Sequence, residues 1–339
     1  MLPYDGIGGA EAAARSMAEA PAEDLDFRLS FLFPAVSSTR QRLATFRPMA
    51  FVKACRALVR EKPDVLVVSL WRSCVVGAMV KLLRPRTRLA VMIHNSIDAH
   101  AADWLSTRLA MALADAVWAD SEASMRLRFR RAPRAPVTVI PFLTHHLTAG
   151  EGDPGAGDPV PTFAFWGRLA GQKNLFRALE LFRAVHRVHR GARFSVIGPD
   201  CGERSKLEAW CAHAGLSQAV HFIGPLSSEA IREVARDHCF YLQTSDYEGM
   251  AMSVVEAMQL GLVPVVTPVG EIRAYCRDGE NAIVVGDVGA AAADVLRVLD
   301  DPARWRALRR QALETWRGAP LYRDAVAAAC RRLSPACVR

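Results

Sequence analysis

The chain alternates short apolar segments with longer amphipathic ones on both sides of one break, residues 148–161, which is rich in Gly, Pro and Asp. Such alternation predicts parallel sheets that are covered by helices on both faces. A chain of 339 residues has room for two domains of roughly 100–200 residues each. We therefore expect an α/β fold with two facing, doubly wound, Rossmann-like domains, a cleft between them, and C-terminal helices that cross the junction.

The pattern divides the chain into a first domain at 1–147, a linker at 148–161, a second domain at 162–316 and a helix at 317–339 that packs back across the junction. Strands are predicted at 27–33, 65–70, 89–93, 116–119, 137–142, 162–166, 193–197, 220–223, 239–243, 263–267 and 282–285. Helices are predicted near 48–61, 73–84, 102–114, 121–131, 174–190, 203–214, 228–237, 251–260, 287–298, 302–316 and 320–333.

The composition narrows the class of protein. Apolar residues make up 51% of the chain and charged residues 23%, which is ordinary for a soluble globular protein. No apolar run reaches the ~18–20 residues that span a bilayer, and the first residues lack a signal-peptide pattern. The eight cysteines show no C-x-x-C spacing, so we expect free thiols in a reducing cytoplasm rather than a zinc site or disulfides.

The positive charge is concentrated in the first half of the chain. Residues 1–150 hold 20 Lys and Arg against 13 Asp and Glu, which gives +7 of the total net charge of +8. Basic residues alternate with apolar ones in the segment 40–60, and this fits either a peripheral contact with an anionic membrane or an arginine-rich solvated surface. Nucleic-acid binding is not expected, because the charge is dispersed and no known module is present.

Residues 245–261 form the most informative local pattern. They contain two carboxylates, Glu248 and Glu256, eight positions apart across the start of a predicted helix that Gly249 opens and Gly261 closes. The helix is otherwise apolar and must be buried, so a carboxylate on it needs a partner, which a ligand rich in hydroxyl groups would supply. The plain alternative is a core helix with one solvent-facing glutamate. The polar residues of the helix recur at every third position: Ser253, Glu256 and Gln259.

A second pattern follows the predicted strand 162–166. Arg168 and Lys173 lie on a loop that leads into a helix, which Asn174 can cap. A lysine beside a helix N-terminus opposes the helix dipole, so an anion bound there would explain its position. Both residues could instead be ordinary surface cations.

Together, these two segments resemble the Glu-x7-Glu motif and the Gly-Arg-Leu…Lys-Asn loop of glycosyltransferase family 4. These group 1 enzymes are retaining, depend on nucleotide sugars and have the GT-B fold. The resemblance implies that Arg168 and Lys173 grip the donor diphosphate, that Glu248 holds the donor sugar and that Glu256 binds the ribose. The residues implied in donor binding are Gly8, Gly9, Gly167, Gly198, Gly224, Gly249, Met250, Ala251, Met252, Ser253 and Glu256.

The sequence departs from the family pattern at several points. The residues after Glu248-Gly249 are Met250-Ala251-Met252 instead of Phe-Gly-Leu, which narrows the space beside the sugar. Gln172 stands where the family usually has Glu, and Pro141-Phe-Leu stands where it has Pro-Asn-Gly.

The resemblance also implies roles in the first half of the chain, which is the acceptor side in this family. His94 follows the predicted strand 89–93 and matches the family's histidine near the transfer centre, although a structural histidine is the plain alternative. Gly8 and Gly9 resemble the family's Gly-Gly loop. That loop should follow a first strand, yet only five residues precede the glycine segment, so the first strand is expected to be missing. Either the chain start is placed too late or the centre of the sheet is weakened, and we favour the late start. His145 and His146 are adjacent and are interpreted as structural.

We therefore expect a retaining, metal-independent glycosyltransferase that needs no cofactor and moves a sugar from a nucleotide-diphosphate sugar to an acceptor hydroxyl. The catalytic residues would be His94, Glu248, Arg168 and Lys173. The expected partners are the donor and a sugar or lipid-linked acceptor of polysaccharide or glycolipid synthesis. The expected location is the cytoplasm, with possible contact at the inner face of the membrane. The alternatives are a non-catalytic GT-B protein that binds a nucleotide sugar or a membrane surface, and a sugar-nucleotide epimerase.

Overall fold

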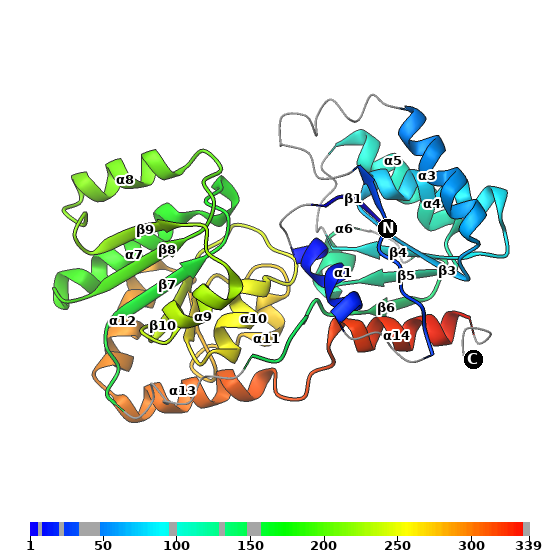
Figure 1. The fold of residues 1–339 in the computed structure, drawn as a ribbon. Helices are drawn as coiled ribbons and strands as arrows, with labels where there is room; N and C mark the ends of the chain where they lie inside the picture. The colour runs from blue at the N-terminus through cyan, green and yellow to red at the C-terminus, as the bar shows by residue number, and fades with distance from the viewer. Residues whose placement is uncertain are drawn as a thin grey trace. The chain divides into compact units, whose positions relative to one another are not determined.

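The computed structural model describes residues 1–5, 9–19, 24–33, 48–94, 100–128, 133–147 and 157–334. The chain divides into two compact units. Unit 1 contains Met1–His145 and Pro320–Arg339, and unit 2 contains His146–Ala319. Figure 1 shows strands and helices alternating along the chain in both units.

Unit 2 is built on a six-stranded parallel sheet. Its strands are β7 (Thr162–Trp166), β8 (Arg193–Ile197), β9 (Val220–Gly224), β10 (Phe240–Gln243), β11 (Val263–Val266) and β12 (Ile283–Val284). Its helices are η2 (Gly171–Lys173), α7 (Leu175–Val188), α8 (Arg204–His213), α9 (Ser228–Ala235), α10 (Met252–Gln259), α11 (Ile272–Tyr275), α12 (Val288–Leu299) and α13 (Pro302–Thr315). Strands β10 and β11 are buried at every residue, as expected for a parallel sheet with both faces covered.

The order of these strands locates a binding position. The sheet runs β12-β11-β10-β7-β8-β9, so the chain starts at β7 in the middle, builds outward to β9, and returns to the other side of β7 with β10. The strand order therefore reverses between β7 and β10. Ligands of open parallel sheets bind beyond the carboxyl ends of the strands at such a switch point.

Unit 1 contains a four-stranded parallel sheet in the order β3-β4-β5-β6 and a parallel pair, β1-β2. Its strands are β1 (Leu2–Tyr4), β2 (Phe31–Phe33), β3 (Val65–Ser69), β4 (Arg88–Ile93), β5 (Ala116–Ala119) and β6 (Val137–Val139). Its helices are α1 (Gly9–Glu19), α3 (Pro48–Glu61), α4 (Trp71–Leu83), α5 (Ala101–Leu113), α6 (Glu122–Arg128) and α14 (Tyr322–Leu333).

The pair β1-β2 continues the larger sheet. The Met1 nitrogen donates to the Val67 carbonyl at 2.6 Å, and the Ser69 N–H donates to the Met1 carbonyl at 3.3 Å. Strand β1 thus lies beside β3, and the order becomes β2-β1-β3-β4-β5-β6, with its reversal between β1 and β3. The expectation that no strand precedes the glycine segment was wrong, because residues 2–4 form one.

The last two helices belong to different units. Helix α13 packs against α10, α12 and β11 of unit 2. Helix α14 packs against α1 of unit 1, and Figure 1 shows the two side by side, red beside dark blue. Arg331 of α14 holds Asp24 through two hydrogen bonds of 2.6 and 2.7 Å.

Most predicted elements lie within one or two residues of the observed ones, with two clear exceptions in unit 1. The strand predicted at 27–33 is confined to β2, because β1 offers only three residues for pairing. The strand predicted at 137–142 ends at Val139, since its partner β5 ends at Ala119.

Candidate functional site

The loops that follow β7 and β10 are joined to each other at the switch point of unit 2. The Asp246 N–H donates to the Gln172 carbonyl at 3.0 Å, and the Gln172 side chain donates to the Tyr247 carbonyl at 2.8 Å. The Asn174 amide donates to Asp246 at 2.9 Å instead of capping α7 as predicted. Asn174 itself has φ 43°, in the left-handed region. These bonds fix the two loops, and with them the side chains that follow.

Lys173 and Glu248 form an ion pair across these two loops. The Lys173 Nζ lies 2.7 Å from the Glu248 Oε1, and the two side chains are 12% and 8% exposed. The Gln243 amide donates to the same oxygen at 3.2 Å. A lysine outside the helix therefore supplies the partner of Glu248, where the sequence predicted a ligand. The cation predicted to bind a diphosphate is thus held by a carboxylate.

Glu256 lies on α10 and faces β7. Its Oε2 accepts a hydrogen bond of 2.8 Å from the Trp166 indole N–H. One turn earlier, the Ser253 hydroxyl donates to the Gln243 Oε1 at 2.9 Å. The third residue of the predicted polar stripe, Gln259, accepts from the Leu147 N–H at 3.0 Å. The stripe is thus present, and contacts within unit 2 hold each of its members.

Three glycines close the ends of neighbouring strands. Gly167 follows β7, Gly198 follows β8 and Gly224 ends β9, and all three have positive φ. A Cβ on Gly198 would lie 1.8 Å from the Gly167 carbonyl oxygen. No other residue fits there, because a backbone atom cannot yield as a side chain can. Gly198 is itself buried, whereas Gly167 and Gly224 are partly exposed where the family resemblance implies nucleotide binding.

The turn before α10 differs from the prediction. The helix begins at Met252, so Gly249, which was expected to open it, lies in the preceding turn, and Ala251 at the N-cap has φ 56°. Alanine carries no polar atom that could cap the first amides of the helix. Main-chain contact with Gly270 holds this turn, since a Cβ on Gly270 would lie 2.2 Å from the Glu248 carbonyl oxygen.

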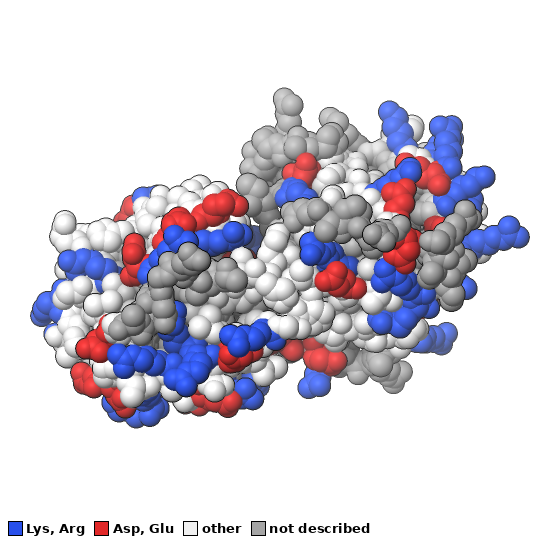
Figure 2. Space-filling model, turned by 60° about the horizontal axis from the view of Figure 1, so that its bottom comes forward, with Lys and Arg blue, Asp and Glu red and all other residues white. Residues whose placement is uncertain are grey.

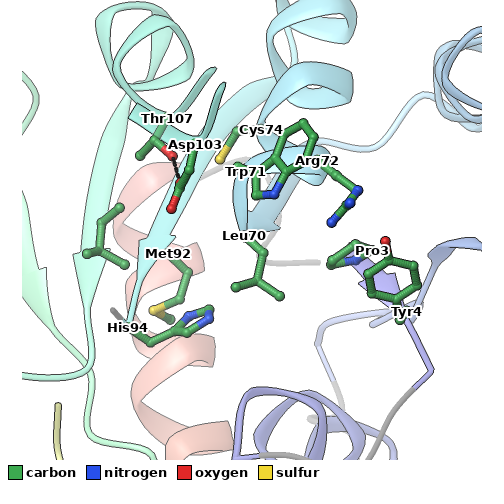
Figure 3. A pocket seen from close by; sticks show the side chains of 11 residues that line it. Pro3, Tyr4, Leu70, Trp71, Arg72, Cys74, Met92, His94, Asp103 and Thr107 are labelled. Carbon is green, nitrogen blue, oxygen red and sulfur yellow. Dashed lines mark hydrogen bonds between the residues drawn. The ribbon is translucent and has the colours of Figure 1, made fainter. Parts of the chain in front are cut away.

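In unit 1, His94 follows β4 at the carboxyl end of the sheet. Its Nδ1 lies 3.1 Å from the Ser69 hydroxyl, and its ring packs on Phe142 with centroids 5.7 Å apart. It also lines a cavity beside the ends of β1 and β3, which Figure 3 shows. Gly9 is the first residue of α1 and is exposed, while Gly8 lies outside the described residues.

The second half of the chain matches a known family. Residues 153–315 match the model of the glycosyl transferases group 1. Nearly half of the chain is thus similar to the group 1 glycosyl transferases.

The curated relatives of this chain are distant. It is 29% identical over 147 residues to GDP-mannose:cellobiosyl-diphosphopolyprenol alpha-mannosyltransferase of Xanthomonas oryzae pv. oryzae, which covers 43% of this chain and 39% of that protein. It is 28% identical over 265 residues to 2-deoxystreptamine glucosyltransferase of Streptomyces kanamyceticus, which covers 77% of this chain and 60% of the relative. The chain therefore spans less than two thirds of either relative.

Solved structures resemble the whole chain. HepE of Anabaena in complex with UDP and glucose has a TM-score of 0.78 at 17% identity and covers 98% of both chains. Sucrose-phosphate synthase of Thermosynechococcus elongatus has a TM-score of 0.72 at 19% identity and covers 99% of this chain and 96% of its own. The fold of this chain is accordingly GT-B.

Several other residues predicted from the sequence are exposed. Arg168 is exposed on the loop after β7. His145 and His146 are exposed as well. In the part of the chain that the structure describes, no three His, Cys, Asp or Glu side chains are grouped so that they could hold a metal ion. The seven described cysteines are free thiols, and six of them are buried.

The basic segment predicted at 40–60 is described only from residue 48 onward. On the face shown in Figure 2, Lys and Arg side chains lie in several separate groups with Asp and Glu among them. No helix of the described residues is both long and apolar enough to cross a bilayer.

Three residues of the site were missed from the sequence. Gln243 is fully buried at the end of β10 and contacts both Glu248 and Ser253. Trp166 ends β7 and holds Glu256, while Gln172, noted only as a departure from the family pattern, joins the two loops. A polar residue at the end of an otherwise apolar strand was the signal that could have identified Gln243.

Proposed function

We propose that this chain is a retaining glycosyltransferase that moves a sugar from a nucleoside-diphosphate sugar to an acceptor hydroxyl, in the synthesis of a polysaccharide or glycolipid. The observation that carries the proposal is the convergence of Lys173, Glu248 and Glu256 at the switch point of unit 2. A largely buried cation and two carboxylates suit a ligand that combines phosphates with sugar hydroxyls.

The known proteins favour the same class of reaction. The relative from Xanthomonas is named for GDP-mannose and a diphosphopolyprenol, and the HepE structure contains UDP and glucose. Both names describe those proteins, and for this chain they indicate which donors and acceptors to test.

Within this proposal, Lys173 changes partner during the reaction. The Glu248 carboxylate holds it in the absence of donor, and the diphosphate of the donor would compete for the same ammonium group. Arg168, exposed on the same loop, would add a second positive charge. Two cations on the leaving diphosphate stabilise the charge that develops in the transition state, so the proposed reaction needs no metal ion.

Glu256 would accept hydrogen bonds from the ribose hydroxyls. Its bond to Trp166 fixes the orientation of the carboxylate before the nucleotide binds, which lowers the entropy lost on binding. No carboxylate is assigned as a nucleophile. The leaving phosphate oxygen would take the proton of the acceptor hydroxyl, which attacks on the same face of the sugar. The anomeric configuration of the sugar is therefore retained. The roles of His94 and Gly9 rest on the resemblance and stay predictions.

Thermal-shift measurements with UDP, GDP, ADP and their common sugar conjugates, made with a chelator present, test the donor site. We expect one nucleotide series to raise the melting temperature, and the Glu256→Ala variant to lose that rise. Glu180→Ala, which changes an exposed carboxylate on α7, is the matched control and should keep it.

Turnover with the stabilising donor separates the alternatives. A glycoside product with the donor's anomeric configuration supports the proposed transferase. Binding without glycoside formation favours the non-catalytic alternative, and a donor converted to its epimer favours the epimerase. No shift with any nucleotide would contradict the site itself.

A further inference from the structure

Helix α5 of unit 1 exposes apolar residues and buries polar ones. Trp104, Leu105 and Leu109 are 48%, 61% and 52% exposed. On the opposite side of the helix, the polar residues Asp103, Ser106 and Thr107 are buried. A helix on the surface of a globular protein normally turns its apolar stripe to the core. Over residues 101–109, α5 therefore has the reverse of the usual pattern.

Hydrogen bonds within the helix compensate for the burial of these polar groups. The Ser106 hydroxyl donates to the Ala102 carbonyl at 2.6 Å, and the Thr107 hydroxyl donates to the Asp103 Oδ1 at 3.0 Å. Water offers no such compensation to the exposed tryptophan and leucines, so a partner that covered them would lower the free energy. Contiguous exposed apolar residues of this kind mark interaction surfaces.

The exposed residues of α5 form one stripe along the helix. Positions 104, 105, 108, 109 and 112 lie on one face at helical spacing. Of these, only position 108 carries a charge. The Arg108 guanidinium carbon lies 4.8 Å from the centre of the Trp104 ring. An arginine stacked in this way covers apolar surface with its stem and keeps its charge at the edge of that surface.

Helix α14 of the same unit has the ordinary arrangement. Its residues Tyr322, Val326 and Cys330 are buried, while Asp324 and Arg332 are exposed. The reversed pattern of α5 is accordingly not a general property of the helices that cover this sheet.

The layer of helices that contains α5 is basic at its surface. Helix α4 packs against both α3 and α5, and Figure 1 shows these three on one side of the sheet of unit 1, with α14 on the other. In residues 48–94 and 100–113, all of which the structure describes, the exposed acidic residues are Glu61 and Asp64. The exposed basic residues in the same ranges are Lys53, Arg56, Arg60, Lys62, Arg86 and Arg88. A partner of this layer should therefore be negatively charged.

We propose that α5, together with the basic residues of its layer, docks on the surface of an anionic lipid bilayer. Trp104, Leu105 and Leu109 would enter the boundary between headgroups and acyl chains, where tryptophan is enriched. Arg108 and the basic residues of α3 would lie at the level of the lipid phosphates. A second copy of the chain fits less well, because in a symmetric dimer the same basic surface would face itself.

This docking requires neither donor nor turnover, so it goes beyond the proposed reaction and does not depend on it. The sequence indicated a membrane contact only through the segment 40–60 and its charge. Here the apolar part of the surface lies on α5, whose exposed residues only the structure identifies.

Flotation of the full chain with lipid vesicles tests the proposal. The probes are vesicles of phosphatidylcholine alone and of equal parts of phosphatidylcholine and phosphatidylglycerol. We expect binding to the anionic vesicles that is weaker at high salt, because salt screens the charges, and weaker still for the neutral vesicles.

The double variant Leu105→Ser with Leu109→Ser should bind the anionic vesicles more weakly by about tenfold or more, because two apolar side chains no longer enter the bilayer. Val188→Ser, which changes an exposed apolar residue on α7 of unit 2, is the matched control and should bind as the wild type does.

Fluorescence gives a second measurement that does not depend on the folding of the serine variant. Lipids brominated on their acyl chains quench tryptophans that enter the bilayer. Trp104→Phe keeps an aromatic side chain, so it should still bind the anionic vesicles but lose most of the quenching seen with the wild type.

Three results would overturn the proposal. The first is no binding of the wild type to anionic vesicles, and the second is equal binding by the wild type and a double variant with an unchanged melting temperature. The third is quenching in Trp104→Phe as strong as in the wild type. If light scattering showed a dimer that the double variant dissociates, without vesicle binding, α5 would be an interface between copies instead. The thermal shift with nucleotides tests unit 2 separately, so failure of the docking and failure of the proposed function are distinguishable.

Discussion

The switch points of the two units are constructed differently. In unit 2, main chain packs on main chain: Gly198 on the Gly167 carbonyl, and Gly270 on the Glu248 carbonyl. In unit 1, side chains enclose a cavity, with Asp103 in its wall and Leu70 held in a strained conformation beside it. The first arrangement suits extended contact with a ligand backbone such as a diphosphate. The second encloses a small space between side chains.

The difference also predicts which substitutions each site tolerates. A loop packed by its main chain cannot accept a single extra carbon, while a cavity of side chains can adjust by small rotations. Unit 2 should therefore be sensitive at its glycines, and unit 1 at the few polar groups inside its cavity.

The largest expected difference in stability is between two glycine-to-alanine substitutions, one in each unit. Gly198→Ala places a Cβ 1.8 Å from a backbone oxygen at φ 142°, so we expect a loss of about 4 kcal/mol or more. Gly77→Ala in α4 of unit 1 meets the Val68 Cγ1 at 2.8 Å and the Leu89 Cδ1 at 3.1 Å. These are side-chain atoms, which can move aside, and alanine favours the helix by ~1 kcal/mol relative to glycine. The free energy of unfolding should therefore change by no more than about 2 kcal/mol.

Chemical and thermal denaturation of both variants provide the measurement. Gly171→Ala is the control within unit 2, because a Cβ there has no neighbour within 4 Å, and we expect its stability to be near that of the wild type. Equal losses at positions 198 and 77 would contradict the proposed difference between main-chain and side-chain construction.

Two partly buried ion pairs give the next comparison. Lys173→Ala leaves Glu248 with the Gln243 amide, so we expect a loss of about 3 kcal/mol, along with a fall in transfer rate of about 10²–10³-fold. Lys81→Ala in unit 1 leaves Asp115 with Arg88 at 3.0 Å and the main-chain N–H of residue 89 at 2.8 Å. We expect Lys81→Ala to lower the free energy of unfolding by about 1–2 kcal/mol without changing the transfer rate.

The double variant Lys173→Met with Glu248→Gln separates stability from catalysis. Replacing both charges removes the carboxylate that has lost its lysine partner, so the melting temperature should recover toward that of the wild type, while the transfer rate stays low. If the rate recovered together with the stability, Lys173 would have no direct role in the reaction.

Much of unit 2 could be predicted from the sequence because only a few residue types fit the positions of its site. A glycine required by a close main-chain contact, as at Gly198, and charged residues in an apolar segment, as at Glu248, are visible in a single sequence. The ion pair between Lys173 and Glu248 was not predicted, since 75 positions separate them and only the fold brings the ends of β7 and β10 together.

Less of unit 1 could be predicted, for a physical reason. Asp103 lies in a helical segment where an exposed aspartate would be ordinary, and Leu70 looks like the last residue of an apolar strand. Only the packing shows that the first is buried and the second strained. Strand β1 was missed because its three residues carry almost no periodic signal, and it forms through pairing with distant segments.

The smallest expected effect is a pH dependence confined to unit 2. Burial lowers the pKa of His238 below its usual 6.5, although a hydrogen bond from its Nδ1 to the Val234 carbonyl partly opposes this. The unfolded chain therefore binds more protons than the folded one below about pH 6.5. The contribution of the neutral ring to stability is complete above that pH and is lost as the pH falls through the folded pKa.

His238→Gln should reduce the loss of stability between pH 8 and pH 5 by less than about 1 kcal/mol, as measured by urea denaturation at both values. His213→Gln, at an exposed position on α8, is the matched control and should leave the pH dependence unchanged. If His238→Gln and His213→Gln behave alike, the pH dependence of unit 2 comes from another group, and the buried hydrogen bond between His238 and Ser195 has no part in it.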